Sequence, residues 1–260
     1  MNDLTNAVWI ELRKATRSRM PLFTALGVLL LACGLAFFML IYKYPTFARS
    51  SGLISAKANL AGGAATWPYY LDLLGRAIAI GGILLFSLVE SWVFGREFAD
   101  GTLKDLLAVP ISRAMLLLAK FIVVVLWSLL LTVVLFLVCF LLGAAIGLSQ
   151  GTPEVFWHGT ATLAVAACLV IFTVFPFAFF ASVGRGYLLP MGVTLLVAVL
   201  GNIVAVAGWA NYFPWAVPAL HVELAGRGNL EPVSYLLVFL TGLAGMAGTY
   251  FWWRCADQNR

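Results

Sequence analysis

Few side chains in this sequence are spaced to do acid–base, nucleophilic or metal chemistry. Asp100 and Asp105 are the nearest pair of carboxylates, but no third carboxylate follows at helical spacing to complete a Mg²⁺ site for lipid phosphotransfer. His221 and Glu223 offer two potential metal ligands, whereas a structural zinc site usually has four. The sequence therefore predicts no catalytic group and no metal site.

Cofactor and nucleic-acid motifs are also missing from the sequence. No Lys follows a Gly, so the G-x-x-x-x-G-K-[ST] loop that cradles ATP phosphates does not occur, and we expect this chain to bind no cofactor. The four cysteines contain no C-x-x-C pair and are interpreted as packing residues. The net charge of +5 comes from residues that flank apolar runs, so we expect no nucleic-acid partner.

Charge is concentrated instead in residues 93–113, VFGREFADGTLKDLLAVPISR. Asp100 and Gly101 are expected to end one helix there. Thr102, with Asp105 three residues later, forms a weak capping-box pattern that begins another helix. The sequence thus predicts a short helix bounded on both sides.

This predicted helix has one apolar stripe. Leu103, Leu106 and Leu107 follow at i, i+3 and i+4, and Pro110 ends the helix before Ser112, which can cap the next one. A two-turn helix with an apolar stripe and charged flanks is typical of an element that docks into a groove of a partner. A solvated loop that folds back on the membrane surface remains the alternative.

The amino-acid composition indicates the class of protein to which these residues belong. The chain has 260 residues, of which 63% are hydrophobic and 10% charged, and its mean hydropathy is +1.00. That leaves too little polar surface for a water-soluble globule. A helix needs about 20 apolar residues to cross a hydrocarbon core about 30 Å thick. We predict an all-α integral membrane protein, a single domain over residues 1–260, with six spans at 20–44, 71–94, 113–148, 159–183, 186–209 and 232–253.

Apart from Lys43, Arg113 and Lys120 towards the span ends, the charged side chains inside the predicted spans are Asp72, Arg76 and Glu90. Asp72 and Arg76 are spaced i, i+4 on one helix face, so they can neutralise each other near the helix end. Glu90 lies deeper and is the one lone carboxylate. Acids within a membrane are functional candidates by default, so Glu90 is either a substrate or proton site or a structural anchor close to Arg96.

An outer segment is predicted between the last two spans. Residues 186–220 form an uncharged run that is too long for one span and too short for two. Its tail carries Pro214 and Pro218 among the aromatic residues Tyr212 and Trp215. This pattern favours short broken helices that dip into the outer interface within residues 210–231.

The distribution of Lys and Arg predicts the orientation. With the N-terminus in the cytoplasm, 11 of the 16 Lys and Arg residues lie on the inner side, as the positive-inside rule requires. Both termini and residues 95–112 are then cytoplasmic. Residues 1–19 are predicted to form an amphipathic helix on the inner membrane surface, with a frayed tail as the alternative. The apolar face of this helix would consist of Leu4, Val8, Leu12 and Ala15.

The stretch REFADGTLKDLLAVPISRAMLLLAK resembles the signature region of ABC-2-type permeases, the membrane subunits of ABC exporters. In that region a Glu, a G-T-L, a pair of leucines, a Pro and an S-R follow the second span. The matching residues here are Glu97, Gly101, Thr102, Leu103, Leu106, Leu107, Pro110, Ser112 and Arg113. The layout is similar too, with an N-terminal interfacial helix, six spans and the aromatic segment YFPWAVP before the last span.

The resemblance implies partners and roles. Residues 95–112 would form a coupling helix seated on a separate ABC ATPase subunit, present in two copies, which holds ATP and Mg²⁺. Glu97 and Arg113 would flank that contact, Glu97 meeting basic groups of the ATPase. A second permease copy, identical or related, would complete the pathway. Residues 210–231 would form re-entrant helices on the outer face of the bacterial cytoplasmic membrane.

The sequence thus predicts the permease subunit of an ATP-driven exporter that is not itself an enzyme. The scarcity of charge within the spans favours an amphipathic peptide, an antibiotic or a lipid-like substrate without identifying it. One alternative is a membrane receptor or assembly factor that docks a partner other than an ATPase. Another, with less support, is a lipid-modifying membrane enzyme, which needs a cluster of carboxylates or histidines at one membrane depth.

Overall fold

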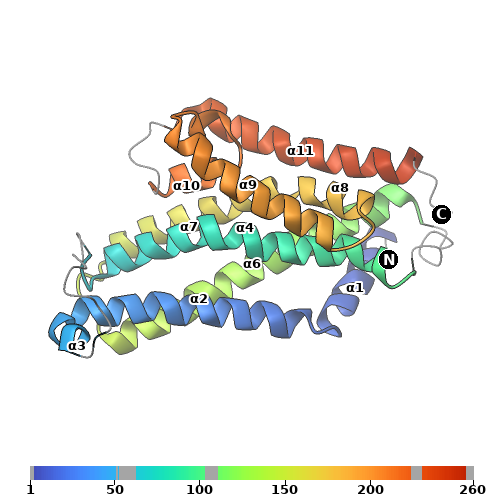
Figure 1. Cartoon of the computed structure of the whole chain (residues 1–260). Coiled ribbons are helices and arrows are strands. Elements are labelled where there is room, and N and C mark those ends of the chain that lie inside the picture. The colour runs from blue at the N-terminus through green and yellow to red at the C-terminus, as the bar shows by residue number, and fades with distance from the viewer. Residues whose placement is uncertain (1–2, 51, 53–62, 103–110, 224–229, 256–260) are drawn as a thin grey trace.

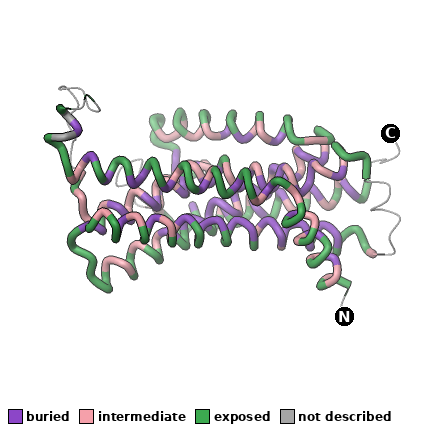
Figure 2. The backbone as a smooth tube through the Cα atoms, turned by 90° about the horizontal axis from the view of Figure 1, so that it is seen from below, coloured by how far each residue is buried: buried purple, intermediate pink, exposed green. Residues whose placement is uncertain are grey.

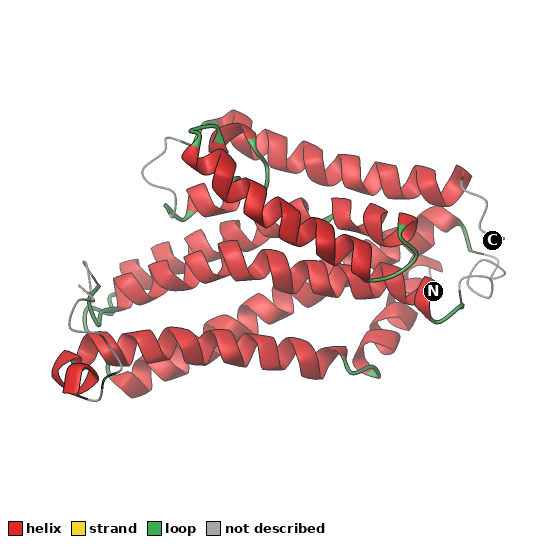
Figure 3. Ribbon diagram, in the orientation of Figure 1, coloured by secondary structure: helices red, strands yellow, loops and turns green. Residues whose placement is uncertain are grey.

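The computed structural model describes residues 3–50, 52, 63–102, 111–223 and 230–255, and these residues form helices and their connections without a β-strand. Six helical segments are long and apolar enough to cross a membrane (Figure 3). The predicted all-α membrane fold with six spans is therefore confirmed. The described ends of the chain lie at the same end of the bundle as the end of α4 (Figure 1).

The N-terminal helix α1 (Asp3–Thr16) lies at an angle to α2 (Met20–Lys43) and packs on α6 (Arg113–Ile146). Its buried stripe, Ala7, Glu11 and Ala15, faces the protein, while Trp9 and Ile10 are exposed. Ala15, expected on a membrane face, is therefore a bundle contact. A short helix, α3 (Pro45–Ser50), follows α2 at the opposite end.

Helix α4 (Trp67–Ala99) is the centre of the bundle, in contact with α2, α6, α7, α8 and α9. It extends beyond the predicted span of 71–94 at both ends. Pro68 stands in its first turn, where the missing N–H costs no hydrogen bond. At the other end the helix continues to Ala99, because the first residue after it that has a left-handed backbone is Gly101, at φ +68°. Glu97 is thus helical instead of part of the loop.

The third and fourth spans also differ in detail from the predicted ranges. Ser112 Oγ accepts a hydrogen bond from the Met115 amide and caps α6, as expected. The fourth span begins earlier, at Pro153, and consists of two helices, α7 (Pro153–Val174) and α8 (Pro176–Val183). The sequence analysis missed this break. Pro176 causes it, because a proline inside a helix removes a backbone donor and clashes with the preceding turn.

The last spans are the least covered by the rest of the chain. Helix α9 (Leu188–Val206) has 17% of its most apolar stretch buried, against 61% for α4. The 3₁₀ turn η1 (Ala210–Tyr212) and the short helix α10 (Val217–His221) follow, and α11 (Pro232–Cys255) ends the described chain. Residues 210–223, the described start of the predicted outer segment, are therefore broken into short helical pieces.

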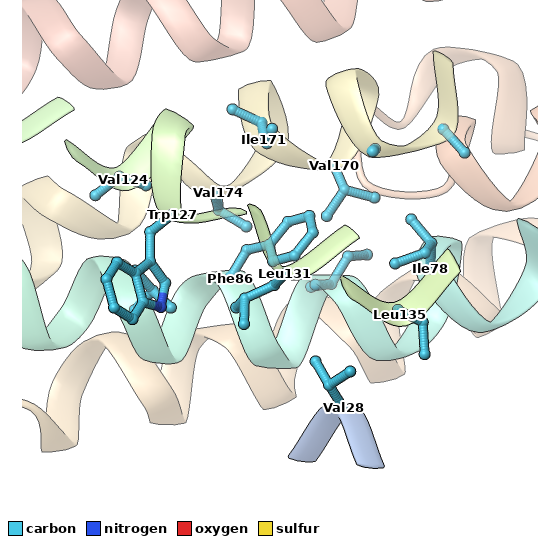
Figure 4. Packing of buried hydrophobic residues seen from close by; sticks show 14 of the residues in the cluster. Val28, Ile78, Phe86, Val124, Trp127, Leu131, Leu135, Val170, Ile171 and Val174 are labelled. Carbon is cyan, nitrogen blue, oxygen red and sulfur yellow. The ribbon is translucent and has the colours of Figure 1, made fainter. Parts of the chain in front are cut away.

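The buried core lies between α2, α4, α6 and α7, along the middle of the bundle (Figure 2). Val28, Phe86, Leu131 and Val170 represent the four helices in it (Figure 4). In a membrane this packing, and not exclusion from water, holds helices together.

Glycines allow two of the closest helix approaches. A Cβ on Gly245 of α11 would lie 2.5 Å from the Pro176 nitrogen of α8, and one on Gly143 of α6 would lie 2.7 Å from the Trp67 ring. Both distances are too short for a side chain, so these glycines serve packing within the chain.

Candidate functional site

Four charged side chains meet where α1 lies beside the end of α4 and the start of α6, and we call them the ion cluster: Glu11, Lys14, Glu97 and Lys120. Lys120 Nζ lies 3.1 Å from Glu11 Oε2 and 3.1 Å from Glu97 Oε1. Lys14 Nζ lies 2.8 Å from Glu11 Oε1 and 2.9 Å from Glu97 Oε1. Two cations thus alternate with two carboxylates, and α1, α4 and α6 are joined by them.

The ion cluster is largely shielded from solvent. Lys120 is 1% exposed, Glu97 3% and Glu11 7%, and Lys120 Nζ also donates to the Val93 carbonyl oxygen at 3.0 Å. Buried charges persist only when they are paired and hydrogen-bonded, and the cluster meets both conditions.

Lys14 is the most accessible member of the cluster, and its α1 position lies outside the spans. Burial by itself lowers the pKa of this ammonium group, but the carboxylates of Glu11 and Glu97 overcome that effect and raise the pKa above its usual value of 10.5. Lys14 therefore stays charged throughout the physiological range.

The loop that follows α4 is bonded directly to the ion cluster. Thr102 Oγ1 donates to Glu97 Oε2 at 2.7 Å, across the turn made by Gly101. Arg96 Nε lies 3.0 Å from Asp100 Oδ2, and Arg96 Nη1 donates to the Lys14 carbonyl oxygen at 3.4 Å. Thr102 is therefore connected through Glu97 to Lys14 of α1 and to Lys120 of α6.

A cavity of about 330 Å³ opens beside the ion cluster. Its wall includes Lys14 and Glu97 together with Thr102 and Ile111, the described residues on either side of the gap at 103–110. Residues Leu103, Leu106, Leu107 and Pro110, predicted to form the apolar stripe and its end, lie outside the described residues.

Arg113 makes a separate connection at the same end of the bundle. Its Nη1 donates to the Trp253 carbonyl oxygen of α11 at 2.6 Å, and Trp253 Nε1 donates to Ser182 Oγ of α8 at 2.9 Å. The structure thus brings Glu97 and Thr102 together and gives Arg113 a different contact.

In the described structure the basic groups that contact Glu97 are Lys14 and Lys120 of its own chain, so its contact with basic groups of a partner stays a prediction. The sequence analysis missed Glu11, Lys14 and Lys120 as members of the site. One signal was present in the sequence: Glu11 and Lys14 are spaced i, i+3 on one helix face, where opposite charges pair. No local spacing pointed to Lys120, whose two carboxylate partners come from other helices.

The described start of the predicted outer segment, residues 210–223, contacts the helix bundle. Trp215 Nε1 donates to the Thr173 carbonyl oxygen at 2.8 Å, next to the break between α7 and α8. Pro218 is buried in the first turn of α10, whereas Tyr212 is 62% exposed. Pro214 lies between η1 and α10, where its fixed φ suits a turn.

The charged residues within α4 differ in whether they have a partner among the described residues. Arg76 Nη2 lies 2.9 Å from Asp72 Oδ2, so the predicted pair forms. Glu90 is fully buried, and neither carboxylate oxygen has a hydrogen-bond partner in the described part of the chain. Arg96, the expected neighbour of Glu90, is paired with Asp100 instead. Within the described ranges, no three His, Cys, Asp or Glu residues form a group that could hold a metal ion.

Comparisons with known proteins agree with this architecture. A family model described as "ABC-2 family transporter protein" matches residues 7–201, well over half of the chain. The bacitracin transport permease protein BCRB of Bacillus licheniformis is 26% identical over 182 residues, which cover 68% of this chain and 85% of that protein. The family match includes every member of the ion cluster. The chain therefore belongs to the ABC-2 transporter family and is a multi-pass transmembrane subunit of an ABC transporter.

Proposed function

We propose that this chain is the permease subunit of an ATP-driven exporter in a bacterial cytoplasmic membrane, and that residues 100–112 transmit the motion of a separate ATPase. The observation that carries the proposal is the bonding of Glu97. Its carboxylate accepts from Thr102 in the loop while it pairs with Lys14 of α1 and Lys120 of α6. A movement of the loop would thus be transmitted to α1, α4 and α6 through charge-assisted hydrogen bonds.

The contact with the ATPase is assigned to the loop leucines. Leu103, Leu106 and Leu107 lie outside the described residues, so the assignment rests on their spacing and on the family to which the chain belongs. An apolar stripe of this kind binds by entering a hydrophobic groove. Two ATPase subunits, carrying ATP and Mg²⁺, would serve two permease copies.

The pathway is assigned to the face formed by α4, α9 and α10. A groove of about 470 Å³ lies there, lined mainly by small and apolar side chains such as Ala79, Gly201 and Ala216, with Asn202 as its polar member. Helix α9 leaves Leu196, Val199 and Val206 exposed beside it. A second permease copy placed against this face would cover α9 and enclose the groove as a pathway.

An apolar groove with few polar groups suits an amphipathic or lipid-like solute better than a small hydrophilic one. The relative from Bacillus licheniformis is named for the transport of bacitracin. We therefore infer a peptide antibiotic or similarly amphipathic molecule as the substrate class, and a role in antibiotic resistance.

The orientation and the outer segment complete the proposal. Helix α1 would lie at the inner surface, with Trp9 and Arg13 facing the headgroups; the Arg13 guanidinium stacks 4.9 Å from the centre of the Trp9 ring. Residues 210–231 would close the outer exit as short re-entrant helices. Both termini would be cytoplasmic.

Co-purification tests the proposal. The tagged chain is expressed together with a candidate ABC ATPase from the same organism and purified in mild detergent, and ATP hydrolysis is measured with and without bacitracin. We expect a stable complex whose hydrolysis rate rises with substrate. Capture of a partner that lacks an ATP site, with no hydrolysis, would favour a receptor or assembly factor instead.

A further inference from the structure

Glu90 is a carboxylic acid that is buried in the helix bundle and has no hydrogen-bond partner among the residues that the structure describes. It lies in the inner half of α4, seven residues before Glu97, and its exposed fraction is 0%. Both carboxylate oxygens lack a hydrogen-bond partner among the described residues. This situation contrasts with Glu97, whose oxygens both have partners.

Two cations could be expected to neutralise Glu90: Arg96 on the same helix and Lys120 near the start of α6. Both are already paired with other groups. Arg96 pairs with Asp100. Lys120 Nζ is shared by Glu11, Glu97 and the Val93 carbonyl oxygen. Neither cation is available to neutralise Glu90 without breaking a bond that is present.

The helices packed against α4 offer Glu90 few other titratable groups. Helices α8 and α9 contain no Asp, Glu, His, Lys, Arg, Cys or Tyr residue. The charged or histidine side chains on α2, α6, α7 and α10, apart from Lys120, are Lys43, Arg113, Glu154, His158 and His221.

Each of these five side chains lies in the first or last turns of its helix. Lys43 donates to the Ile146 carbonyl, Arg113 to that of Trp253, and His221 Nδ1 contacts the Tyr235 hydroxyl. Glu154 and His158 stand in the first turns of α7, at the end opposite the ion cluster. Tyr42 contacts Tyr69 near the same end. The thiols that remain on these helices are Cys33, Cys139 and Cys168.

An ionised carboxylate enclosed in this way would have no compensating charge, and the group instead binds a proton. We propose that Glu90 is a proton-binding site: it holds a proton while the helices are packed as described, and releases it when α4 moves and water reaches the carboxyl group. Transport would then be linked to one proton per permease copy. The site belongs to the permease alone, so its test needs no ATPase.

An isosteric substitution tests whether the proton is bound. Glu90→Gln keeps the size of the side chain and its lack of charge, so we expect the apparent melting temperature of the purified chain at about pH 7 to stay within about 1 °C of the original. The matched control is Glu97→Gln on the same helix, which leaves Lys120 and Lys14 short of a negative charge and should lower that temperature by several degrees. A comparable loss from Glu90→Gln would mean an ionised, paired Glu90 and would overturn the proposal.

A second measurement tests whether the proton is released on opening. Ser87 lies one helical turn from Glu90, is fully buried, and donates to the Leu84 carbonyl oxygen. Ser87→Cys is placed in a chain whose four native cysteines are replaced, with and without Glu90→Gln, and the rate of alkylation by a small thiol reagent is followed from about pH 7 to about pH 9.

Thiolate formation accelerates alkylation in both chains, by up to about tenfold per pH unit, and an ionised Glu90 close to the thiol would by its charge alone slow alkylation in the chain that retains it. We expect a further increase, of about tenfold over this range, in the chain that retains Glu90, because ionisation of Glu90 opens the packing around it. Identical pH profiles in the two chains would show that Glu90 releases no proton linked to helix movement.

Discussion

Lys120 Nζ of α6 and Glu97 Oε1 of α4 lie 3.1 Å apart, and both residues are almost completely shielded from solvent. Their contact holds the last turn of α4 against α6 at the point where the chain leaves the bundle for the loop at 100–112. The Glu97 carboxylate also accepts a hydrogen bond from Thr102. Glu97 therefore both stabilises the packing of the helices and holds the start of the loop in place.

Lys120→Met is expected to destabilise the bundle strongly. It removes a buried cation and leaves Glu11 and Glu97 with Lys14 alone, and breaking a buried pair in this way typically costs about 3–5 kcal/mol. Thermal unfolding of the purified chain measures the effect. Lys14→Met is the matched control and should cost less, since the Lys14 side chain is 29% exposed. Equal losses from the two substitutions would contradict the arrangement described.

Thr102→Val should separate coupling from stability. The change keeps the shape of the side chain but removes the hydrogen bond to the charged Glu97 carboxylate, worth about 1.5–3 kcal/mol, so the helices stay folded while the loop is no longer tied to the ion cluster. We expect substrate-stimulated ATP hydrolysis to fall relative to basal hydrolysis. Thr16→Val is the control, because its hydroxyl donates to the Arg13 carbonyl at an exposed site on α1. An unchanged ratio for Thr102→Val would count against transmission through Glu97.

Leu106→Asp should abolish binding of the ATPase while the permease still inserts and folds. A charge placed in a desolvated contact typically costs a few kcal/mol, which is about two orders of magnitude in affinity. Pull-down of the ATPase measures it, with Lys104→Ala as the control, where only a weak rim-charge effect is expected. Substitutions of Glu97 or Arg113 should weaken binding less. If the ATPase binds Leu106→Asp as tightly as the original chain, the segment is a solvated loop.

The outer segment should matter for transport and not for assembly. Replacing both Pro214 and Pro218 with Ala lets the backbone before α10 and in its first turn adopt other conformations, and the expected result is impaired substrate export with the ATPase still bound. Export is measured in cells, and complex formation by co-purification. Trp215→Phe is a narrower companion variant, because it removes the hydrogen bond to the Thr173 carbonyl oxygen while it keeps an aromatic ring, although a smaller one, at this position. Normal export by the double variant would exclude a role for the segment in closing the exit.

The proposed orientation predicts which positions can be labelled in intact cells. In a chain without its native cysteines, Ser51→Cys and Asn229→Cys should react with a membrane-impermeant thiol reagent applied outside, and Ala99→Cys should not. Ala99 ends α4 next to the ion cluster. Labelling of Ala99→Cys from outside would invert the topology and place the ion cluster on the wrong face for an ATPase.

The sequence by itself determined the number of spans and the family. Hydrophobic runs of membrane-crossing length are a local property, because each helix satisfies its own backbone hydrogen bonds whatever its neighbours are. The family resemblance was equally local, since it depended on residues between Glu97 and Arg113. The Asp72–Arg76 pair and the Ser112 cap could be predicted for the same reason, as both connect residues within one helical turn.

Only the tertiary structure decided which charges meet. Lys120 of α6 pairs with Glu11 of α1 and Glu97 of α4, which lie 109 and 23 residues away along the chain. Glu90, seven residues from Glu97 on the same helix, has no partner in the described part of the chain. No local spacing distinguishes these two acids, because the energy of a buried charge depends on which side chains other helices bring within a few ångströms of it.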